Sequence, residues 1–420
     1  MKIALISYEY PPDTAIGGIA TYVFQIAKVL HSRGHHIEVF CGSPHRSDSQ
    51  EENGIWVHRV IGQNGSDFSE SIGRVFAKRH QSIQFDVIEG PEFSACARGA
   101  VAQVPNIPLV IKLHTPTFLV RKINFVELSL NGKIRWVTGA LRRGKIPTHF
   151  PQWKYDPSSD IERIHALEAD EIASPSKSIG NELITTWSLP RERVFHIPYP
   201  YVPSQDLLDI PIETHTNVVT FIGRLEIRKG ILDLAQAIPT ILKQCPTTKF
   251  RFVGSALPSP QRNLNMREYL EKKLKSYHKS LEFTGGVSPD RIPSLLAKTD
   301  VCVFPSRWES VGFVCLEAMA AARGVVGSSA GGMAELLDGG RVGRLIPPNN
   351  SKKIAQAVIE LLKNPQLRMQ LGQAARDRVL SEYNLDRIGE LQEASYQRAI
   401  DRRKSLGARN LNFTDSTEND

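Results

Sequence analysis

The chain has 420 residues, of which 41% are apolar and 23% are charged; these values exclude a disordered protein, and the length predicts two domains. Its five cysteines are scattered and lack CxxC spacing, which indicates neither a disulfide framework nor a zinc cluster and favours a reducing compartment. The formal net charge of +8 favours anionic partners, a class that includes nucleotides, anionic lipids and nucleic acids.

The first half of the chain alternates short apolar runs with stretches of helical spacing. Residues 2–7 predict a buried strand, and apolar residues between Ile19 and Leu30 recur at helical intervals. Further strands are predicted at residues 36–41, 86–89, 109–113, 171–173 and 194–197. Short strands separated by helices are typical of a parallel sheet. Residues 1–205 are therefore predicted to form one α/β domain, which ends in the proline-rich stretch 198–203.

A second alternating series follows this stretch. Strands are predicted at residues 218–222, 250–253, 281–284, 301–305 and 325–328, and residues 351–402 have helical spacing. We therefore expect a second doubly wound α/β domain over residues 206–385. Residues 386–409 are expected to form a terminal helix that packs back toward the first domain, and residues 410–420 a polar tail.

Residues 121–160 mix basic side chains with aromatic and aliphatic ones. The basic residues are Arg121, Lys122, Lys133, Arg135, Arg142, Arg143, Lys145 and Lys154, and the apolar ones are Phe125, Leu128, Trp136, Phe150 and Trp153. Such a segment is typical of a solvated helical excursion, of a surface for an acceptor, or of a contact with an anionic membrane. The sequence leaves these interpretations open.

Gly17 and Gly18 follow the first predicted strand and precede a predicted helix. Backbone amides without side chains can approach a phosphate closely at such a position, and the helix dipole favours an anion there. A Gly-Gly pair is also a common turn, so this interpretation depends on the rest of the site.

Gly223 and Arg224 hold the corresponding place in the second predicted domain, and Lys229 follows five residues later. Two fixed cations at the carboxyl end of a strand can neutralise a leaving diphosphate, the role that magnesium has in other enzymes. No Asp-x-Asp pair occurs in the chain, so we expect no metal and no other cofactor. Taken alone, Arg224 and Lys229 would also fit ordinary surface charges.

Glu309 and Glu317 are separated by seven residues, and Gly312 and Phe313 lie where a predicted strand gives way to a helix. Glu309 is therefore predicted to lie in the loop, and Glu317 in the early turns of the helix. Two carboxylates beside a helix N-terminus can accept hydrogen bonds from sugar and ribose hydroxyls, while the exposed amides hold phosphate.

This stretch resembles the E-x7-E signature of family-4-type glycosyltransferases of the GT-B fold, and the resemblance spans nearly the whole chain. It implies two Rossmann-like domains that face each other across a cleft, with a nucleotide-sugar donor on the second domain and an acceptor on the first. By the same resemblance, Glu317 would bind the donor ribose and Glu309 the hydroxyls of the transferred sugar. Arg224 and Lys229 would bind the diphosphate. The donor-binding residues implied in all are Gly17, Gly18, Gly223, Arg224, Lys229, Glu309, Gly312, Phe313, Val314 and Glu317.

His114 ends a predicted strand of the first domain, where open sheets place their ligands. It matches the family's active-site histidine, which lies near the transferred sugar. Glu89 and Glu92 end the neighbouring predicted strand and are candidates for acceptor binding, although turn chemistry alone also accounts for them. In one departure from the family, Pro198-Tyr199-Pro200-Tyr201 replaces an Asn-Gly-Val-Asp loop, so specificity cannot be carried over from relatives.

The sequence thus predicts a retaining, metal-independent transferase that moves a hexose-type sugar from a UDP- or GDP-linked donor to a hydroxyl of a glycan, glycolipid or small molecule, as in polysaccharide biosynthesis. The catalytic candidates are His114, Arg224, Lys229 and Glu309. The alternatives are a nucleotide-sugar-binding protein without activity, and an epimerase or phosphorylase on the same fold.

Further expectations concern partners and location. No nucleic-acid-binding module is recognisable, so no nucleic-acid partner is expected. No apolar run approaches the roughly 20 residues that span a bilayer, and the N-terminus becomes polar too soon for a signal peptide. We expect a cytoplasmic protein, with residues 121–160 as the candidate contact with the inner membrane face.

Overall fold

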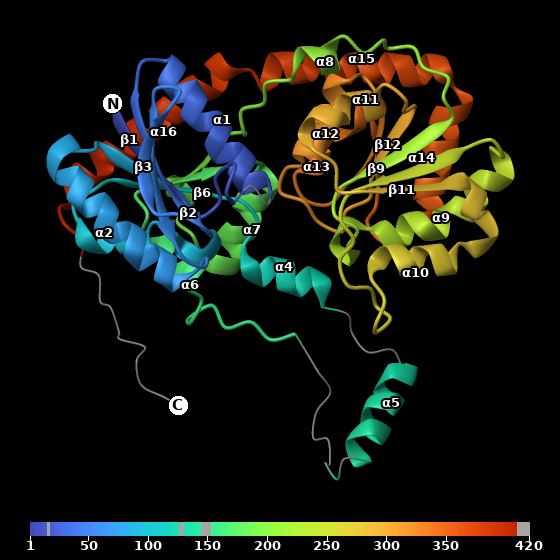
Figure 1. The fold of residues 1–420 in the computed structure, drawn as a ribbon, viewed down its shortest axis with the longest axis horizontal. Coiled ribbons are helices and arrows are strands. Elements are labelled where there is room, and N and C mark those ends of the chain that lie inside the picture. Colours follow the sequence, from blue (N-terminus) through green and yellow to red (C-terminus); the bar gives the residue numbers. More distant parts are fainter. Residues whose placement is uncertain (15–16, 126–129, 143, 145–152, 410–420) are drawn as a thin grey trace.

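The computed structural model describes residues 1–14, 17–125, 130–142, 144 and 153–409. Two largely parallel sheets lie side by side, and helices flank each of them (Figure 1). The predicted fold class, two doubly wound α/β units, is confirmed. The predicted polar tail at residues 410–420 and parts of the basic segment lie outside the described residues.

The first sheet has eight strands in the order β3-β4-β2-β1-β5-β6-β7-β8. Its strands are β1 (Lys2–Ser7), β2 (His36–Ser43), β3 (Asp48–Glu52), β4 (Ile55–Ile61), β5 (Val87–Pro91), β6 (Leu109–Lys112), β7 (Glu171–Ser174) and β8 (Val194–His196). The helices that accompany it are α1 (Gly18–Ser32), α2 (Ser66–Ile83), α3 (Arg98–Gln103), α4 (Thr117–Asn124), α5 (Leu130–Leu141), α6 (Ile161–Glu168) and α7 (Lys177–Trp187), with short 3-10 turns η1 (Phe93–Ala95) and η2 (Arg191–Arg193).

The second sheet has six parallel strands in the order β11-β10-β9-β12-β13-β14. Its strands are β9 (Val218–Ile222), β10 (Lys249–Val253), β11 (Leu281–Gly285), β12 (Val301–Phe304), β13 (Gly324–Ser328) and β14 (Arg344–Ile346). The α-helices from the linker onward are α8 (Gln205–Leu208), α9 (Ile231–Gln244), α10 (Met266–Lys273), α11 (Ile292–Leu296), α12 (Phe313–Ala320), α13 (Met333–Leu336), α14 (Ser351–Lys363), α15 (Pro365–Glu382) and α16 (Leu385–Leu406). The 3-10 turns are η3 (Ile227–Lys229), η4 (Lys275–Ser280), η5 (Pro289–Arg291) and η6 (Asp338–Gly340).

Three strands, β3, β4 and β14, were not predicted from the sequence. β3 pairs antiparallel with β4 at the edge of the first sheet, and its sequence Asp-Ser-Gln-Glu-Glu has no apolar alternation because the strand is largely exposed. β14 is only three residues long.

The predicted helical region 351–402 consists of three helices, since Pro365 begins α15 and Asn384 caps α16.

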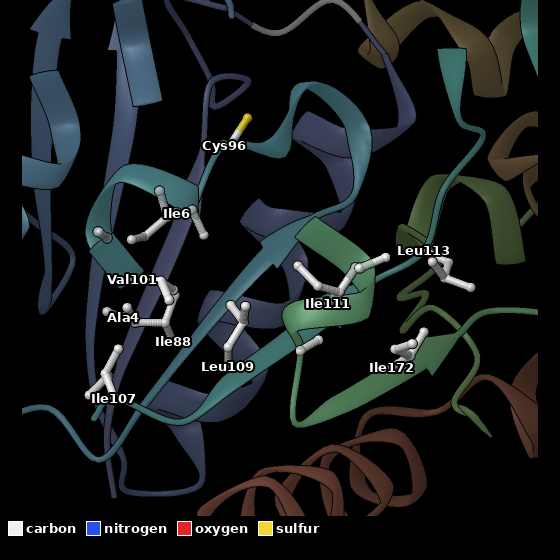
Figure 2. Close-up of a cluster of buried hydrophobic side chains, with 14 of the residues drawn as sticks. Ala4, Ile6, Ile88, Cys96, Val101, Ile107, Leu109, Ile111, Leu113 and Ile172 are labelled. Atoms are coloured by element: carbon white, nitrogen blue, oxygen red, sulfur yellow. The ribbon is translucent and has the colours of Figure 1, made fainter. Parts of the chain in front are cut away.

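Alternate residues of β1 explain how the first sheet buries both faces. Ile3 and Leu5 point to the side covered by α1 and α16, whereas Ala4 and Ile6 point to the opposite side, covered by α2, α3 and α7. Figure 2 shows the second of these cores, built from Ala4, Ile6, Ile88, Cys96, Val101, Ile107, Leu109, Ile111, Leu113 and Ile172. Each large aliphatic side chain buried there contributes roughly 1.5–3 kcal/mol.

Each sheet has one point where the strand order reverses. In the first sheet it lies between β1 and β5, and in the second between β9 and β12. Loops that leave neighbouring strands in opposite directions open a crevice at the carboxyl ends of those strands, where open α/β sheets bind ligands. The loops after these strands therefore carry the candidate site.

The chain crosses between the sheets twice. Residues 198–204 lead from the first sheet to the second, and the end of α15 leads back through Tyr383 to α16, which packs on β5, β6 and β7 (Figure 1). Among the described residues, no helix is long and apolar enough to traverse a bilayer.

A buried ion cluster fastens the returning helix. The carboxylate of Asp170, which is 1% exposed, accepts hydrogen bonds from Arg403 Nη2 at 2.5 Å, from the guanidinium of Arg409 and from the backbone amide of Leu109 at 2.9 Å. Arg409 also donates to the backbone carbonyls of Glu168 and Ile107. The residues after α16 are thus anchored to the base of the first sheet.

Replacing Asp170 by alanine tests this anchor. The change leaves two buried guanidinium groups without their carboxylate, so we expect the unfolding free energy to fall by about 3–5 kcal/mol. The melting temperature should drop by about 10 °C for a domain of this size. Asp401→Ala, on the exposed side of the same helix, is the matched control and should melt like the wild type. Equal melting temperatures for the two variants would show that the cluster does not hold the helix.

Candidate active site

The site is built by loops that follow the strands beside each reversal point. Gly17 and Gly18 follow β1, and His114 follows β6, the neighbour of β5. From the second sheet, Arg224 follows β9 and Glu309 follows β12. The two sets of loops touch: Thr115 Oγ1, next to His114, donates to Ser310 Oγ, next to Glu309, at 3.2 Å. The structure therefore brings the predicted residues of both domains to one seam.

Glu309 is the centre of a charged cluster. Its carboxylate, on a residue that is 8% exposed, accepts a hydrogen bond from Lys229 Nζ and lies 3.8 Å from Arg228 Nη1. Burial acts to raise the pKa of Glu309, but Lys229 and Arg228 outweigh it and hold that pKa below its ordinary value. Burial lowers the pKa of Lys229, and the negative charge of Glu309 opposes that shift. Each member thus keeps the other ionised.

Arg224 completes the cationic side of the cluster. Its side chain is 49% exposed and lies 3.3 Å from Glu226 Oε1, which also accepts from Arg228 at 3.0 Å. Arg224 is therefore less enclosed than Lys229 and has donors to spare for a ligand. Glu226 and Arg228 were not among the predicted residues, because single charges between two motif positions carry no pattern of their own.

Two glycines make this arrangement possible. Gly230 has a φ of +71°, and a Cβ there would lie 1.9 Å from the carbonyl oxygen of Pro305, at the end of β12. Gly331 also has a φ of +71°, and a Cβ there would lie 2.1 Å from the carbonyl oxygen of Glu309. Only glycine tolerates both the left-handed backbone and the close approach. The glycines bring the Lys229 turn and the β13–α13 loop against the Glu309 loop.

Helix α12 begins at this cluster. Gly312 is its N-cap and supplies no side-chain acceptor, so the first-turn amides of Phe313 and Val314 keep the donor capacity that helix N-termini have for anions. Glu317 lies one turn along the helix, and its Oε2 is buried without a hydrogen-bond partner. Burial raises the pKa of Glu317 to about 7. An unpaired carboxylate oxygen beside free amides is suited to a ligand that offers hydroxyl groups and an anion.

The N-terminus of α1 differs from the prediction in one respect. Gly17 is its N-cap, and a Cβ on Gly18 would lie 3.6 Å from the ring of Phe313, so the two helix N-termini face each other across the seam. The carboxylate of Glu9 already lies there, 3.7 Å from where a Cβ of Gly17 would be. Burial raises the pKa of Glu9, while the Ala20 amide and Arg224 act to lower it. A phosphate at Gly17 and Gly18 would meet this carboxylate, a feature that the glycine pattern did not reveal.

His114 is held from two sides. Its backbone amide donates to the carboxylate of Glu92 at 2.8 Å, and its Nδ1 lies 2.7 Å from the hydroxyl of Tyr199. Burial, assisted by the charge of Lys112, lowers the pKa of His114 to about 3. The imidazole is therefore neutral throughout the physiological pH range.

Glu89 and Glu92 do not lie on the cleft surface. Glu89 sits within β5, on the face covered by α1 and α16, where it accepts from Tyr22 at 2.7 Å and from Gln392 and Tyr396 on α16. Glu92 is fully buried beneath His114, and burial together with Glu162 raises its pKa to about 8. Both carboxylates accept hydrogen bonds from groups of the protein itself. In this geometry they stabilise the first domain and do not face an acceptor.

A cavity of about 930 Å³ opens on the first domain. Its walls come from loops at the carboxyl ends of β4, β5 and β6, and they include Thr117, three residues after His114. Aromatic rings of Phe118, Trp153 and Tyr155 line it. Its charged lining residues are of both signs: Arg98, Arg121, Lys154, Glu70, Asp156, Asp160 and Glu162. Of its lining residues, only Arg121, Trp153 and Lys154 were singled out from the sequence, because the cavity is formed by segments that lie far apart in the chain.

The seam also carries a capping interaction between the domains. Glu335 of α13 accepts from the backbone amides of Lys177 and Ser178 at 2.8 Å, in the first turn of α7 on the other domain. Ser178 Oγ lies 3.0 Å from the carbonyl oxygen of Gly331 and 2.8 Å from Glu335. A carboxylate at a helix N-terminus is favoured by the helix dipole. Glu335 thus links the glycine loop behind Glu309 to the first domain.

Within the residues that the structure describes, no group of three or more His, Cys, Asp or Glu side chains is arranged to hold a metal ion.

Removing Glu335 should loosen this link. In Glu335→Ala, the amides of Lys177 and Ser178 lose a charged acceptor, a change of about 1.5–3 kcal/mol. We expect hydrogen exchange of the peptide that contains them to accelerate at least tenfold, as measured by mass spectrometry. Glu213→Ala, an exposed change in the second domain, is the control and should leave that peptide unchanged. Unchanged exchange in Glu335→Ala would mean that the two domains are held together elsewhere.

Comparison with known families covers most of the chain. The family described as Glycosyl transferases group 1 matches residues 208–378, and Glycosyltransferase Family 4 matches residues 16–204. A relative among curated proteins is an uncharacterized glycosyltransferase of Methanocaldococcus jannaschii, which is 26% identical over 92% of this chain and 96% of its own length.

Two solved structures have the same fold as this chain at low sequence identity. Sucrose-phosphate synthase from Thermosynechococcus elongatus superposes with a TM-score of 0.70 at 22% identity, over 94% of this chain and 98% of that one. The Anabaena protein HepE in complex with UDP-glucose superposes with a TM-score of 0.63 at 17% identity, over 94% of this chain and all of its own. These likenesses show the fold.

Proposed function

The chain belongs to the family-4 glycosyltransferases, retaining enzymes of the GT-B fold that use nucleotide sugars, and from this we propose that it moves a hexose from a UDP- or GDP-linked donor to an acceptor hydroxyl. The acceptor would be a glycan, a glycolipid or a small molecule. The donor would lie on the second domain, residues 206–385, and the acceptor on the first, residues 1–205.

One observation carries the donor site. Lys229 and Arg224 are two of the cations that act on Glu309, whose side chain lies against Gly312, the N-cap of α12. Glu317, one turn into the same helix, has a buried Oε2 without a hydrogen-bond partner. This set offers acceptors for ribose and sugar hydroxyls next to donors for a diphosphate. The HepE structure, which holds UDP-glucose on the same fold, supports UDP-glucose as the first donor to test.

The nucleotide diphosphate is the leaving group of the proposed reaction. The acceptor oxygen bonds to the anomeric carbon as the bond from that carbon to the diphosphate breaks, and the acceptor proton passes to a phosphate oxygen of the leaving group. Arg224 and Lys229 would stabilise the negative charge on the diphosphate, without a metal ion. Because His114 is neutral, its ring adds no positive charge next to the sugar, where positive charge grows in the transition state.

The acceptor would enter through the first-domain cavity whose wall includes Thr117. Its aromatic rings suit stacking against sugar rings, and the acidic and basic side chains that line it suit hydrogen bonds with sugar hydroxyls. Helix α5 extends away from the two domains, and its Ile134 and Leu141 are more than half exposed (Figure 1). In a basic segment this favours peripheral contact with an anionic membrane, at which a cytoplasmic enzyme would meet a lipid-linked acceptor.

A panel of nucleotide sugars in EDTA identifies the donor. Melting temperatures of the wild type should rise with one class among UDP-, GDP- and ADP-sugars, and the rise should disappear in Glu317→Ala because the ribose loses its acceptor. Glu271→Ala, an exposed change in α10, serves as the control and should keep the shift. If no donor stabilises the wild type, or if Glu317→Ala responds fully, the proposed donor site is wrong.

The pH dependence of nucleotide binding gives a second check. The ionised carboxylate of Glu317 accepts hydroxyl hydrogen bonds best, and its pKa in the free protein is about 7. Affinity for the donor's nucleotide diphosphate should therefore rise as the pH increases from 6 to 8 and level off above that. In Glu317→Gln this part of the dependence should vanish in titration calorimetry. A wild-type profile identical to that of the variant would contradict the role.

A further inference from the structure

Tyr199 lies in the segment that joins the two domains, at the place where this chain departs from its family. Its side chain is 2% exposed, and its ring contacts those of Tyr22, His114 and Phe313. The ring of His114 stacks on it at 5.2 Å with an interplanar angle of 27°, and the ring of Phe313 stacks at 5.3 Å with an angle of 7°. Tyr199 therefore bridges the histidine of the first domain and the first residue of α12.

The hydroxyl of Tyr199 has the Ser310 side chain as one hydrogen-bond neighbour, whose proton it can accept, and two further contacts that decide where its own proton goes. It lies 2.8 Å from the carbonyl oxygen of Leu113 and 2.7 Å from Nδ1 of His114. A phenol has one proton to donate, and a carbonyl oxygen can only accept. The proton therefore goes to Leu113, and the Tyr199 oxygen is left to accept a proton from Nδ1. No other assignment satisfies both contacts with a neutral imidazole.

We infer that Tyr199 is a positioning residue that fixes His114 in the Nδ1–H form and so presents its bare Nε2 as a hydrogen-bond acceptor toward the substrate. A neutral histidine with a proton on Nδ1 carries its lone pair on Nε2. The group that fits this atom is a sugar hydroxyl. The assignment of a sugar rests on the proposed function, whereas the proton position does not.

The stack also crosses the domain seam. Phe313 is the first residue of α12, and a Cβ on Gly18 would lie 3.6 Å from its ring. The ring of Tyr199 packs against that of Tyr22 at 4.9 Å as well as against that of Phe313, so both domains support it. The stack thus connects the first-domain histidine to the second-domain helix.

Nitrogen NMR of the full chain labelled with ¹⁵N-histidine tests the proton position without any substrate. The signals of His114 are assigned by their loss in His114→Asn. In the wild type we expect Nδ1 to give the signal of a protonated nitrogen and Nε2 that of a bare one. In Tyr199→Phe, which keeps the ring and removes the hydroxyl, the proton should move mainly to Nε2, the form that free histidine favours.

Tyr396→Phe is the matched control. It removes a buried hydroxyl of the same domain, which bonds Glu89 at 2.9 Å and does not touch His114. Its His114 signals should equal those of the wild type. A wild-type spectrum with the proton on Nε2 overturns the inference even if Tyr199→Phe fails to fold, and so does a Tyr199→Phe spectrum identical to the wild type.

Turnover separates this inference from the proposed function. With the donor found in the panel, Tyr199→Phe should lower kcat about tenfold and leave the affinity for the nucleotide diphosphate unchanged, since that part of the donor does not reach His114. A shifted proton with unchanged kcat would overturn the role of Nε2 toward the sugar. Absence of wild-type turnover with every donor would overturn the proposed function and leave the proton assignment standing.

Discussion

The ion pair between Lys229 and Glu309 is the contact on which the rest of the site depends. Both groups are largely enclosed, and burial disfavours the charge on each. Replacing a buried ion pair by apolar groups is often neutral or stabilising, so such a pair is weak evidence for stability. The ion pair matters because it positions the site. It brings a cation from the loop after β9 to a carboxylate from the loop after β12, where the strand order of the second sheet reverses.

The seam between the domains extends this cluster to the first sheet. Hydrogen bonds join the two domains here: Thr115 bonds Ser310, and the carboxylate of Glu335 accepts from the first turn of α7. The stacked rings of His114, Tyr199 and Phe313 add a rigid apolar link at the centre. Because these contacts lie next to the residues that we propose bind the donor, the proposed site draws on both domains.

Much of the fold, and the positions in it of the proposed donor-site residues, could be predicted from the sequence because the signals are local. Apolar runs located nearly every strand, and the spacing of Glu309 and Glu317 around a strand-to-helix transition located α12. The misses have a common cause. Glu9, Glu335 and Tyr199 gain their roles from partners far away in the chain, and no local pattern marks them. Glu89 ends the same apolar run as Glu92, yet strand register turns its side chain toward α16, away from the cleft.

The most direct test of the account is the configuration of the sugar released when the chain turns over its α-linked donor in the absence of an acceptor, with water taking the acceptor's place. Proton NMR recorded before mutarotation identifies the first anomer formed. The account predicts the α-anomer, at a rate that falls at least a hundredfold in Lys229→Ala because the leaving diphosphate loses a buried cation. Release of the β-anomer, or equal rates in the two proteins, would contradict it.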